Sequence, residues 1–370
     1  MTEVRFLKSG HRHDYFLFAL VVILTTAGLV ILASASSDLG RIRFNDSYYY
    51  LKHQLLYGLS FGIAGFLVMA KVHYQYLRRA AFIMLLINIV LLALVFTTAG
   101  ISAGGASRWL KLGPLAFQPS ELLKLTFIIY LAAWLANPKV NRIQNLREGF
   151  IPFFIVSGIL AVLLILQPAT STVVILLLTG LTIYFVSGVR LRYVASAVLI
   201  GLVGLGLVIW RTPYRFDRIL TFLDPARDVQ DTGYQINQAL MTIGSGGFLG
   251  VGYGKSTSKV NYLPAPLDDS IFAVAAQELG FVGAGSLVVL FGTFVFRLLR
   301  IAQGLRDRFG RLILVGFATI VALQSLVNMA AVSGLIPLTG VPLPFISYGG
   351  TALAVFLTMS GIAVNISKYA

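Results

Sequence analysis

Two long stretches without charged residues restrict the fold of this chain more than any other feature. Residues 312–367 contain no Asp, Glu, Lys or Arg over 56 residues, and residues 149–189 contain none over 41. A helix needs about 20 mostly apolar residues to cross the hydrocarbon core of a bilayer. Each stretch therefore has room for two membrane-spanning helices. The Pro- and Gly-rich residues 334–350 divide the first stretch, and Gln167-Pro168 is the expected turn in the second.

The same reasoning applied to the whole chain predicts an all-α integral membrane protein with about ten spanning helices. The spans are expected within residues 15–37, 53–70, 80–107, 121–136, 149–189 (two), 193–210, 270–296 and 312–367 (two). The first apolar segment is too long for a signal peptide, so we expect it to be a retained helix. Residues 1–370 are expected to form one polytopic domain. Residues 211–269 are its large extracytoplasmic loop, between the seventh and eighth helices.

Composition excludes several classes of protein. The chain is 57% hydrophobic and 12% charged, whereas soluble domains are about 45–50% apolar and about 25% charged. It has no cysteine, which excludes disulfides and cysteine-based metal or haem sites, and its four histidines lack metal-ligand spacing. The net charge of +15 is spread along the chain without a dense basic patch. Nucleic-acid binding is therefore not expected.

The distribution of Lys and Arg predicts the orientation in the membrane. Ten spans place both termini on one side. If that side is the cytoplasm, its segments carry 17 Lys and Arg residues, and the short external loops carry five. Basic residues accumulate in cytoplasmic loops. Both termini are therefore expected in the cytoplasm, and residues 211–269 outside.

The glycine-rich segment 244–256 superficially resembles a nucleotide-binding loop. The pattern G-x-x-x-x-G-K-[ST] needs glycine at position 249, which is Leu249. We interpret the segment as a re-entrant turn; a backbone cradle for a diphosphate is the alternative. Just before it, residues 234–243 have helical spacing of apolar residues, which predicts a short interfacial helix.

Five charged residues lie in or at the edge of the predicted spans. Asp268 and Asp269 open the eighth span, where they either cap the helix or act in function. Glu121 and Lys124 are three residues apart on one helix face, so they form a structural ion pair or line a polar cavity. Glu278 has no evident partner in the sequence, which favours a functional role over a bundle contact.

Two further segments are expected at the outer interface or at membrane depth, and neither contains an acidic residue. Arg108, Trp109 and Lys111 place cations and an aromatic ring at the outer interface, where Trp is usually an anchor. Residues 342–350, including Ser347, form an uncharged Pro- and Gly-rich segment before the last span. Irregular backbone at membrane depth is tolerated only where it is buried or lines a cavity.

The order and spacing of its motifs make the sequence resemble the SEDS family of ten-span proteins of shape, elongation, division and sporulation, which includes RodA, FtsW and SpoVE. The resemblance rests on Gly104-Gly-Ala-Ser-Arg-Trp-Leu110, Gln118-Pro-Ser-Glu121 with Lys124, Tyr214-Arg-Phe-Asp-Arg-Ile-Leu220, Asp224-Pro225, Gly233-Tyr-Gln235, Ile243-Gly-Ser-Gly-Gly247, Leu263-Pro264, Asp269-Ser-Ile-Phe-Ala273, Glu278-Leu-Gly280 and Pro344-Phe-Ile-Ser-Tyr-Gly-Gly350. The segments at 233–235 and 250–256 resemble the FtsW division branch more than the elongation branch.

The resemblance implies a peptidoglycan glycosyltransferase that polymerises lipid II at the outer face of the bacterial cytoplasmic membrane during division or elongation. The sugar 4-hydroxyl of one lipid II would attack the anomeric carbon of another and expel the lipid diphosphate. This chemistry needs a general base and stabilisation of the leaving diphosphate. By resemblance, Asp269 is the catalytic base and Glu121 with Lys124 is a functional pair. The further substrate-binding candidates are Arg108, Arg215, Arg218, Asp268, Glu278 and Ser347.

The sequence departs from the family pattern at two acids. Ala169 stands where the family often has Asp in Gln-Pro-Asp-x-Gly, and Ala265 stands where it commonly has Glu in Leu-Pro-Glu-x-x-Thr-Asp. Asp268 partly replaces the second charge. The two missing acids leave fewer carboxylates for metal binding. A divalent cation, Mg²⁺ or Mn²⁺, is the cofactor that the resemblance allows, and the sequence does not identify its ligands.

The resemblance also implies partners and a location. A class B penicillin-binding protein, which is a single-span transpeptidase, is the expected partner, together with other division or elongation membrane proteins. The location would be the inner membrane, including the division septum. Two other functions stay open from the residues: a lipid II flippase, which would use charges inside the membrane, and a scaffold for division proteins.

Overall fold

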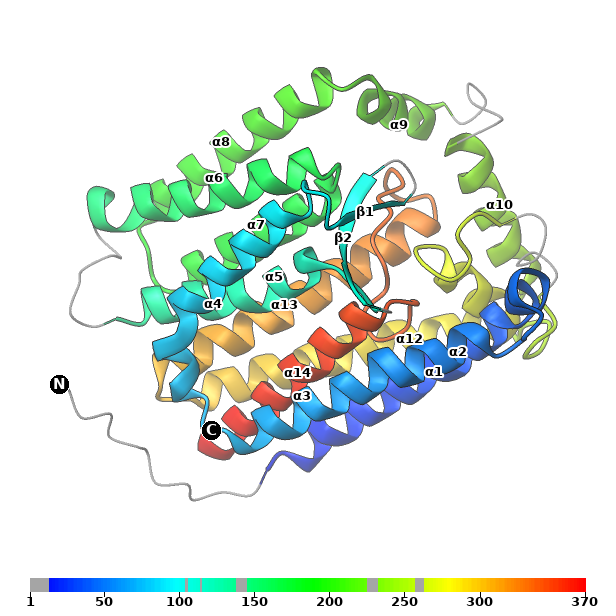
Figure 1. Ribbon diagram of the computed structural model, residues 1–370, viewed down its shortest axis with the longest axis horizontal. Helices are drawn as coiled ribbons and strands as arrows, with labels where there is room; N and C mark the ends of the chain where they lie inside the picture. Colours follow the sequence, from blue (N-terminus) through cyan, green and yellow to red (C-terminus); the bar gives the residue numbers. More distant parts are fainter. Residues whose placement is uncertain (1–12, 104–105, 114, 138–144, 225–231, 257–262) are drawn as a thin grey trace.

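The computed structural model describes residues 13–103, 106–113, 115–137, 145–224, 232–256 and 263–370 (Figure 1). Most of these residues are helical, so the predicted all-α membrane fold is confirmed. The helices are α1 (Tyr15–Phe44), α2 (Tyr49–His53), η1 (Gln54–Leu59), α3 (Ser60–Lys71), α4 (Gln75–Leu94), α5 (Pro119–Leu135), η2 (Leu146–Phe150), α6 (Ile151–Leu166), α7 (Thr170–Val186), α8 (Leu191–Trp210), α9 (Pro213–Leu223), α10 (Thr232–Ser245), α12 (Ile271–Gly304), α13 (Arg308–Val332), α14 (Gly350–Ile366) and η4 (Ser367–Tyr369).

Within the described residues, eight helices are long and apolar enough to cross a membrane. Helix α7 is a shorter apolar helix, and α5 spans 17 residues that include Glu121 and Lys124. The chain is therefore a multi-pass membrane protein. These helices overlap the ranges predicted from the uncharged stretches, and the turn between α6 and α7 falls at Gln167-Pro168 as expected.

The stretch 80–107 holds one span, α4, as expected, but it also holds structure that was not predicted. Helix α4 ends at Leu94, and the chain continues into an antiparallel sheet. Its strands are β1 (Gly100–Ala103), β2 (Ala106–Leu112) and β3 (Leu115–Phe117), in the order β1-β2-β3. A Cβ at Gly100 would overlap the main-chain carbonyl of Val95, so a glycine is needed where the chain leaves the helix.

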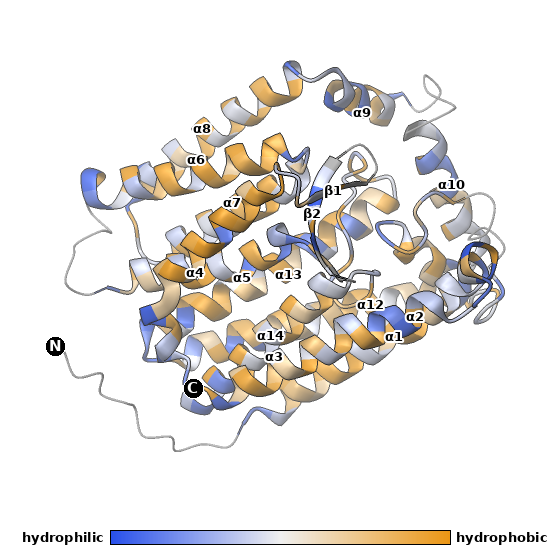
Figure 2. Ribbon diagram, viewed as in Figure 1, coloured by the Kyte–Doolittle hydropathy of each residue, from blue (hydrophilic) through white to orange (hydrophobic). Residues whose placement is uncertain are grey.

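The bundle is densely packed around α13 and α14 and loosely packed at α8. Most residues of α13 and α14 are buried, whereas Tyr193 is the one buried residue of α8. In Figure 1, α8 and α9 extend away from the other helices. Apolar residues cover the exposed helix faces in Figure 2, as expected for surfaces that face lipid.

Helix α12 is interrupted near its beginning by Gly280, whose φ of 69° and ψ of −169° are not helical. The glycine-rich segment packs against this break through main-chain hydrogen bonds. Phe281 N–H donates to Gly247 O (3.0 Å), and Gly252 N–H donates to Glu278 O (3.1 Å). The segment thus forms a tight turn bonded to α12, and its expected re-entrant position in the membrane stays a prediction. Residues 234–243 lie inside α10, so the helix predicted there is confirmed.

Candidate active site

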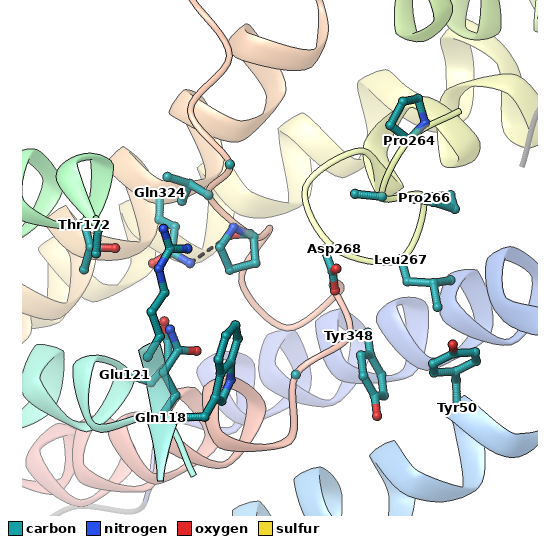
Figure 3. A pocket seen from close by; sticks show the side chains of 18 of the residues that line it. Tyr50, Gln118, Glu121, Thr172, Pro264, Pro266, Leu267, Asp268, Gln324 and Tyr348 are labelled. Atoms are coloured by element: carbon teal, nitrogen blue, oxygen red, sulfur yellow. Dashed lines mark hydrogen bonds between the residues drawn. The ribbon is translucent and has the colours of Figure 1, made fainter. Parts of the chain in front are cut away.

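A cavity of about 850 Å³ lies where β2, α5, α7 and α13 meet the loops before α12 and α14. Gln118, Glu121, Thr172 and Gln324 line one side of this cavity, and Asp268, Tyr348 and Tyr50 line the opposite side (Figure 3). Arg43, Arg108 and Lys124 are its cationic lining residues. The cavity therefore combines acids, cations and apolar walls in a space large enough for part of a large anionic substrate.

The Glu121–Lys124 pair is both a structural ion pair and part of the cavity wall. Lys124 Nζ lies 2.7 and 2.8 Å from the two carboxylate oxygens of Glu121, and both residues are buried. Helix α5 begins at Pro119, which places Glu121 in its first turn near the positive end of the helix dipole. Lys124 Nζ also donates to Gln324 Oε1 (2.9 Å). Its three N–H donors are thus all used within the protein.

Asp268 and Asp269 do not belong to a helix, so the helix-capping interpretation is wrong. Helix α12 begins at Ile271, and its N-cap residue is Ser270. Asp268 lines the cavity and its side chain is exposed. The surrounding protein nevertheless removes enough water to raise the pKa of Asp268 to about 6, and the charge of Asp269 adds to this effect while Arg43 opposes it.

Asp269 follows Asp268 in the chain and lies close to the cavity lining, although it is not itself a lining residue. Its Oδ2 lies 3.8 Å from the position that a Cβ on Gly340, a lining residue, would occupy. Burial raises the pKa of the Asp269 carboxyl, and Arg218 and a hydrogen bond from Gln235 oppose this shift. Asp269 Oδ1 is buried without a hydrogen-bond partner among the described residues.

The structure brings two of the three predicted arginines together. Arg108 lines the cavity and donates to the carbonyls of Gln167 (3.1 Å) and Pro168 (2.6 Å). Burial lowers the pKa of the Arg108 guanidinium, and the nearby charge of Arg218 lowers it further. Arg218 donates to Leu338 O (3.1 Å). Arg215 instead donates to Thr212 Oγ1 (3.0 Å) and does not line the cavity.

Ser347 and Glu278 lie outside the cavity lining. Ser347 Oγ donates to the main-chain oxygen of Asp268 and accepts from Leu343 N (2.7 Å), so it fixes the loop that carries Asp268. Glu278 accepts a hydrogen bond from Ser34 Oγ, which lies 2.6 Å from both carboxylate oxygens. The partner of Glu278 comes from α1, more than 200 residues away, which the sequence could not indicate.

Several lining residues were not named as site candidates from the sequence. They are Arg43, Tyr50, Gln118, Thr172, Gln324 and Tyr348. Gln118 and Tyr348 lie in segments that the sequence analysis singled out, and a signal also existed for Gln324. Gln324 and Asn328 are polar residues four apart in an uncharged span, which places both on one buried helix face. Arg43 was counted only as a loop cation.

Both departures from the family pattern face the cavity. Ala169 and Ala265 are lining residues, and Ala265 adopts a left-handed φ of 46°. Each alanine replaces a carboxylate with a methyl group, so the acidic lining consists of Glu121 and Asp268. Within the part of the chain that the structure describes, no three His, Asp or Glu side chains cluster as metal ligands.

Comparison with known proteins places this arrangement in context. Residues 14–370 match the family of cell cycle proteins that comprises FtsW, RodA and SpoVE. Stage V sporulation protein E of Bacillus subtilis is 35% identical over 96% of this chain and 97% of its own length. A probable peptidoglycan glycosyltransferase FtsW of Trichlorobacter lovleyi is 38% identical over 96% of this chain and 93% of its own length.

Solved structures share the fold. A chain from a peptidoglycan synthase complex, solved to explain the structural coordination of polymerization and crosslinking, superposes with a TM-score of 0.79 at 30% identity. That match covers 96% of this chain and 97% of the other. The rod shape determining protein RodA of Thermus thermophilus superposes with a TM-score of 0.68 at 27% identity, over 96% of both chains.

Proposed function

Because the chain belongs to the FtsW, RodA and SpoVE family of cell cycle proteins, we propose that it is a peptidoglycan glycosyltransferase that polymerises lipid II. The observation that carries this proposal is the cavity that Asp268 lines together with the cations Arg43 and Arg108, with Asp269 close to its lining. A polymerase of this kind needs a base and an anion site within one space. The names of the FtsW relatives support the same activity.

Asp269 is the general base of this proposal. Its ionised carboxylate takes the proton of the acceptor 4-hydroxyl as the oxygen bonds to the anomeric carbon of the donor sugar. The bond between that carbon and the diphosphate oxygen breaks, and its electron pair leaves with the lipid diphosphate. Burial favours this role, because a base with a raised pKa binds the proton more strongly.

Cations at the cavity stabilise the leaving diphosphate. Arg108 lines the cavity and Arg218 lies close to it, and their guanidinium groups match the geometry of phosphate oxygens. The Glu121–Lys124 pair is nearly neutral, and all its donors are used, so its role is to shape the polar side of the cavity.

The proposal includes a divalent cation that binds together with the substrate. Mg²⁺ commonly binds one or two carboxylates and takes its other ligands from water and substrate phosphates. Among the described residues, no three His, Asp or Glu side chains cluster as a ligand set, so the substrate diphosphate and water would supply most ligands of such a cation. The cation would supply charge neutralisation of the diphosphate.

The location and partner of the protein belong to the same proposal. With both termini in the cytoplasm, the cavity opens at the outer face, where lipid-linked sugars are presented. A reporter that is active only outside the membrane, fused after Ala370, is expected to stay silent. A class B penicillin-binding protein is the proposed crosslinking partner, supported by the fold shared with a chain of a peptidoglycan synthase complex. Acylation of the purified chain by penicillin would contradict this division of labour.

The direct test is to incubate the purified protein with lipid II and to resolve the products on a gel. Glycan strands are expected from the wild-type protein and not from Asp269→Asn. Movement of lipid II between the leaflets of proteoliposomes without any polymer would instead support a flippase and overturn the proposal.

A further inference from the structure

Two buried amide side chains on α13 connect the separate parts of the site. Gln324 and Asn328 lie one helical turn apart, and their exposed fractions are 0% and 1%. Neither carries charge, and neither can move a proton at neutral pH. Buried amides in a membrane-spanning helix are costly unless their hydrogen bonds are made, so their partners indicate what they do.

Gln324 connects the ion pair to the loop before α14. Its Oε1 accepts from Lys124 Nζ (2.9 Å), and its Nε2 donates to the main-chain oxygen of Pro342 (2.8 Å). An ammonium group only donates and a carbonyl only accepts, so the amide orientation follows from its partners. The dashed line in Figure 3 marks the bond from Gln324 to Pro342.

Asn328 connects the same loop to the proposed base. Its Nδ2 donates to the main-chain oxygens of Val341 and Asp269, both at 2.7 Å. The bond from Asn328 to the main chain of Asp269 comes from a buried position on helix α13. On the other side, Ser347 holds the main chain of Asp268. The two aspartates are thus held from α13 and from the α13–α14 loop.

We infer that Asn328 is a positioning residue for the polymerisation reaction: it fixes the main chain of Asp269, and through the shared Val341–Pro342 segment it joins that base to Gln324 and the Glu121–Lys124 pair. This inference rests on the proposed function, because it gives Asn328 a role in the same reaction. A misplacement of a reacting group by about 1 Å can reduce a rate by about 10²-fold. The consequence should therefore appear in kcat rather than in lipid II affinity.

The test compares Asn328→Asp with Ser325→Ala. Asn328→Asp keeps the size of the side chain but replaces its donors with acceptors, so Asp269 loses its bond. Ser325 lies on the same helix and is also buried, and its hydroxyl donates to the main-chain oxygens of Val321 and Ala322 in its own helix. Asn328→Asp should reduce kcat by about 10²-fold with little change in KM for lipid II. Ser325→Ala should leave both constants unchanged.

The pH profile separates positioning from a general loss of structure. Asp269 faces Arg218 of α9 and the neighbouring Asp268, and it accepts from the uncharged Gln235 of α10. A new carboxylate at position 328 adds a negative charge beside it, which favours the protonated acid. The acid limb of kcat should therefore move to higher pH in Asn328→Asp. Ser325→Ala should retain the wild-type limb.

Three outcomes are decisive. A wild-type kcat and acid limb in monodisperse Asn328→Asp would overturn the inference and leave the proposed function intact. Absence of glycan strands from the wild-type protein would overturn the proposed function itself. If Asn328→Asp does not fold, Asn328→Ser is tested instead, because its hydroxyl retains one donor. An intermediate kcat is then expected. A wild-type kcat in Asn328→Ser would overturn the inference.

Discussion

Helix α12 has an acidic site at its beginning and another near its break, and the two are built in opposite ways. Asp268 and Asp269 precede the helix by a few residues, in a loop at the cavity. Glu278 lies nine residues after Asp269, against α1 and the glycine-rich segment. In sequence, the two sites give the same signal: an acid beside or inside an apolar span.

Their neighbours distinguish them. At Glu278, the Ser34 hydroxyl contacts the carboxylate, and the main chain of Glu278 and Gln277 is bonded to Gly252 and Val251. At Asp269, one carboxylate oxygen is buried without a partner among the described residues, and the pKa is raised. An acid whose bonds are satisfied by the fold stabilises the fold. An acid that keeps an open acceptor beside a cavity is available for chemistry.

The largest expected effect follows from this difference. Asp269→Asn keeps the size of the side chain but removes its ability to take up a proton, an ability worth about 10²–10⁴-fold in rate. We expect polymerisation to be lost while thermal unfolding in detergent is unchanged. Glu278→Gln should do the reverse, with a clear decrease in Tm and a much smaller decrease in turnover of the folded protein.

Equal losses of turnover in Asp269→Asn and Glu278→Gln would contradict the assignment of a catalytic role to the first acid and a structural role to the second. Loss of activity in Asp269→Asn only through unfolding would return Asp269 to a structural role. Both variants need to be measured in one polymerisation assay, with each rate expressed per mole of monodisperse protein.

The second prediction concerns the break in α12. Gly280 has a φ of 69°, and a Cβ there would overlap the main chain of Leu249 and Gly250. Gly280→Ala should destabilise the protein by about 3 kcal/mol or more, from backbone strain and overpacking together. Gly285 is a matched control on the same helix, because a Cβ there would contact nothing within 4 Å. Gly285→Ala should raise Tm slightly, and a similar decrease in both variants would contradict the proposed tight packing.

The sequence was sufficient for those parts of the fold that depend on composition alone. Runs of uncharged residues located the helices, and the Gln167-Pro168 turn fell where it was predicted. The sheet was missed because its first strand, β1, continues the apolar pattern of α4 without a charge, and the first charge, Arg108, comes only in β2. A hydropathy pattern records which residues avoid water, and both a helix and a hairpin satisfy it.

The site was only partly predictable for a related reason. The spacing of Glu121 and Lys124 predicted their contact, because both lie on one helix. The partner of Glu278, Ser34, and the bond from Asn328 to Asp269 join distant segments, and no local pattern encodes such contacts. Treating Asp268 and Asp269 as part of a helix was wrong, since that helix begins two residues after Asp269.

The third prediction is a pH dependence. A base acts only when it is ionised, so activity falls as the pH falls through its pKa. Burial raises the pKa of Asp269, the proposed base, and that of Asp268 beside it, so the pair should give an acid limb above the ordinary carboxyl value of 3.8. Arg43→Met removes a charge that lowers the pKa of Asp268, so the limb should move to higher pH. A wild-type limb near the ordinary carboxyl value of 3.8 would contradict the raised pKa values.

The smallest expected effect belongs to Asp268→Asn, and it decides which of the two adjacent acids is the base. Asp268 lines the cavity with an exposed side chain, and its main chain is held by Ser347, so the substitution changes charge with little effect on the loop. Removing this negative charge should lower the pKa of Asp269, which would move the acid limb to lower pH and reduce turnover at neutral pH by less than about tenfold. The measurement is the pH profile of polymerisation for Asp268→Asn beside the wild-type protein. If Asp268→Asn is as inactive as Asp269→Asn while both remain folded, Asp268, which lines the cavity, is the base, and Asp269 serves to hold it.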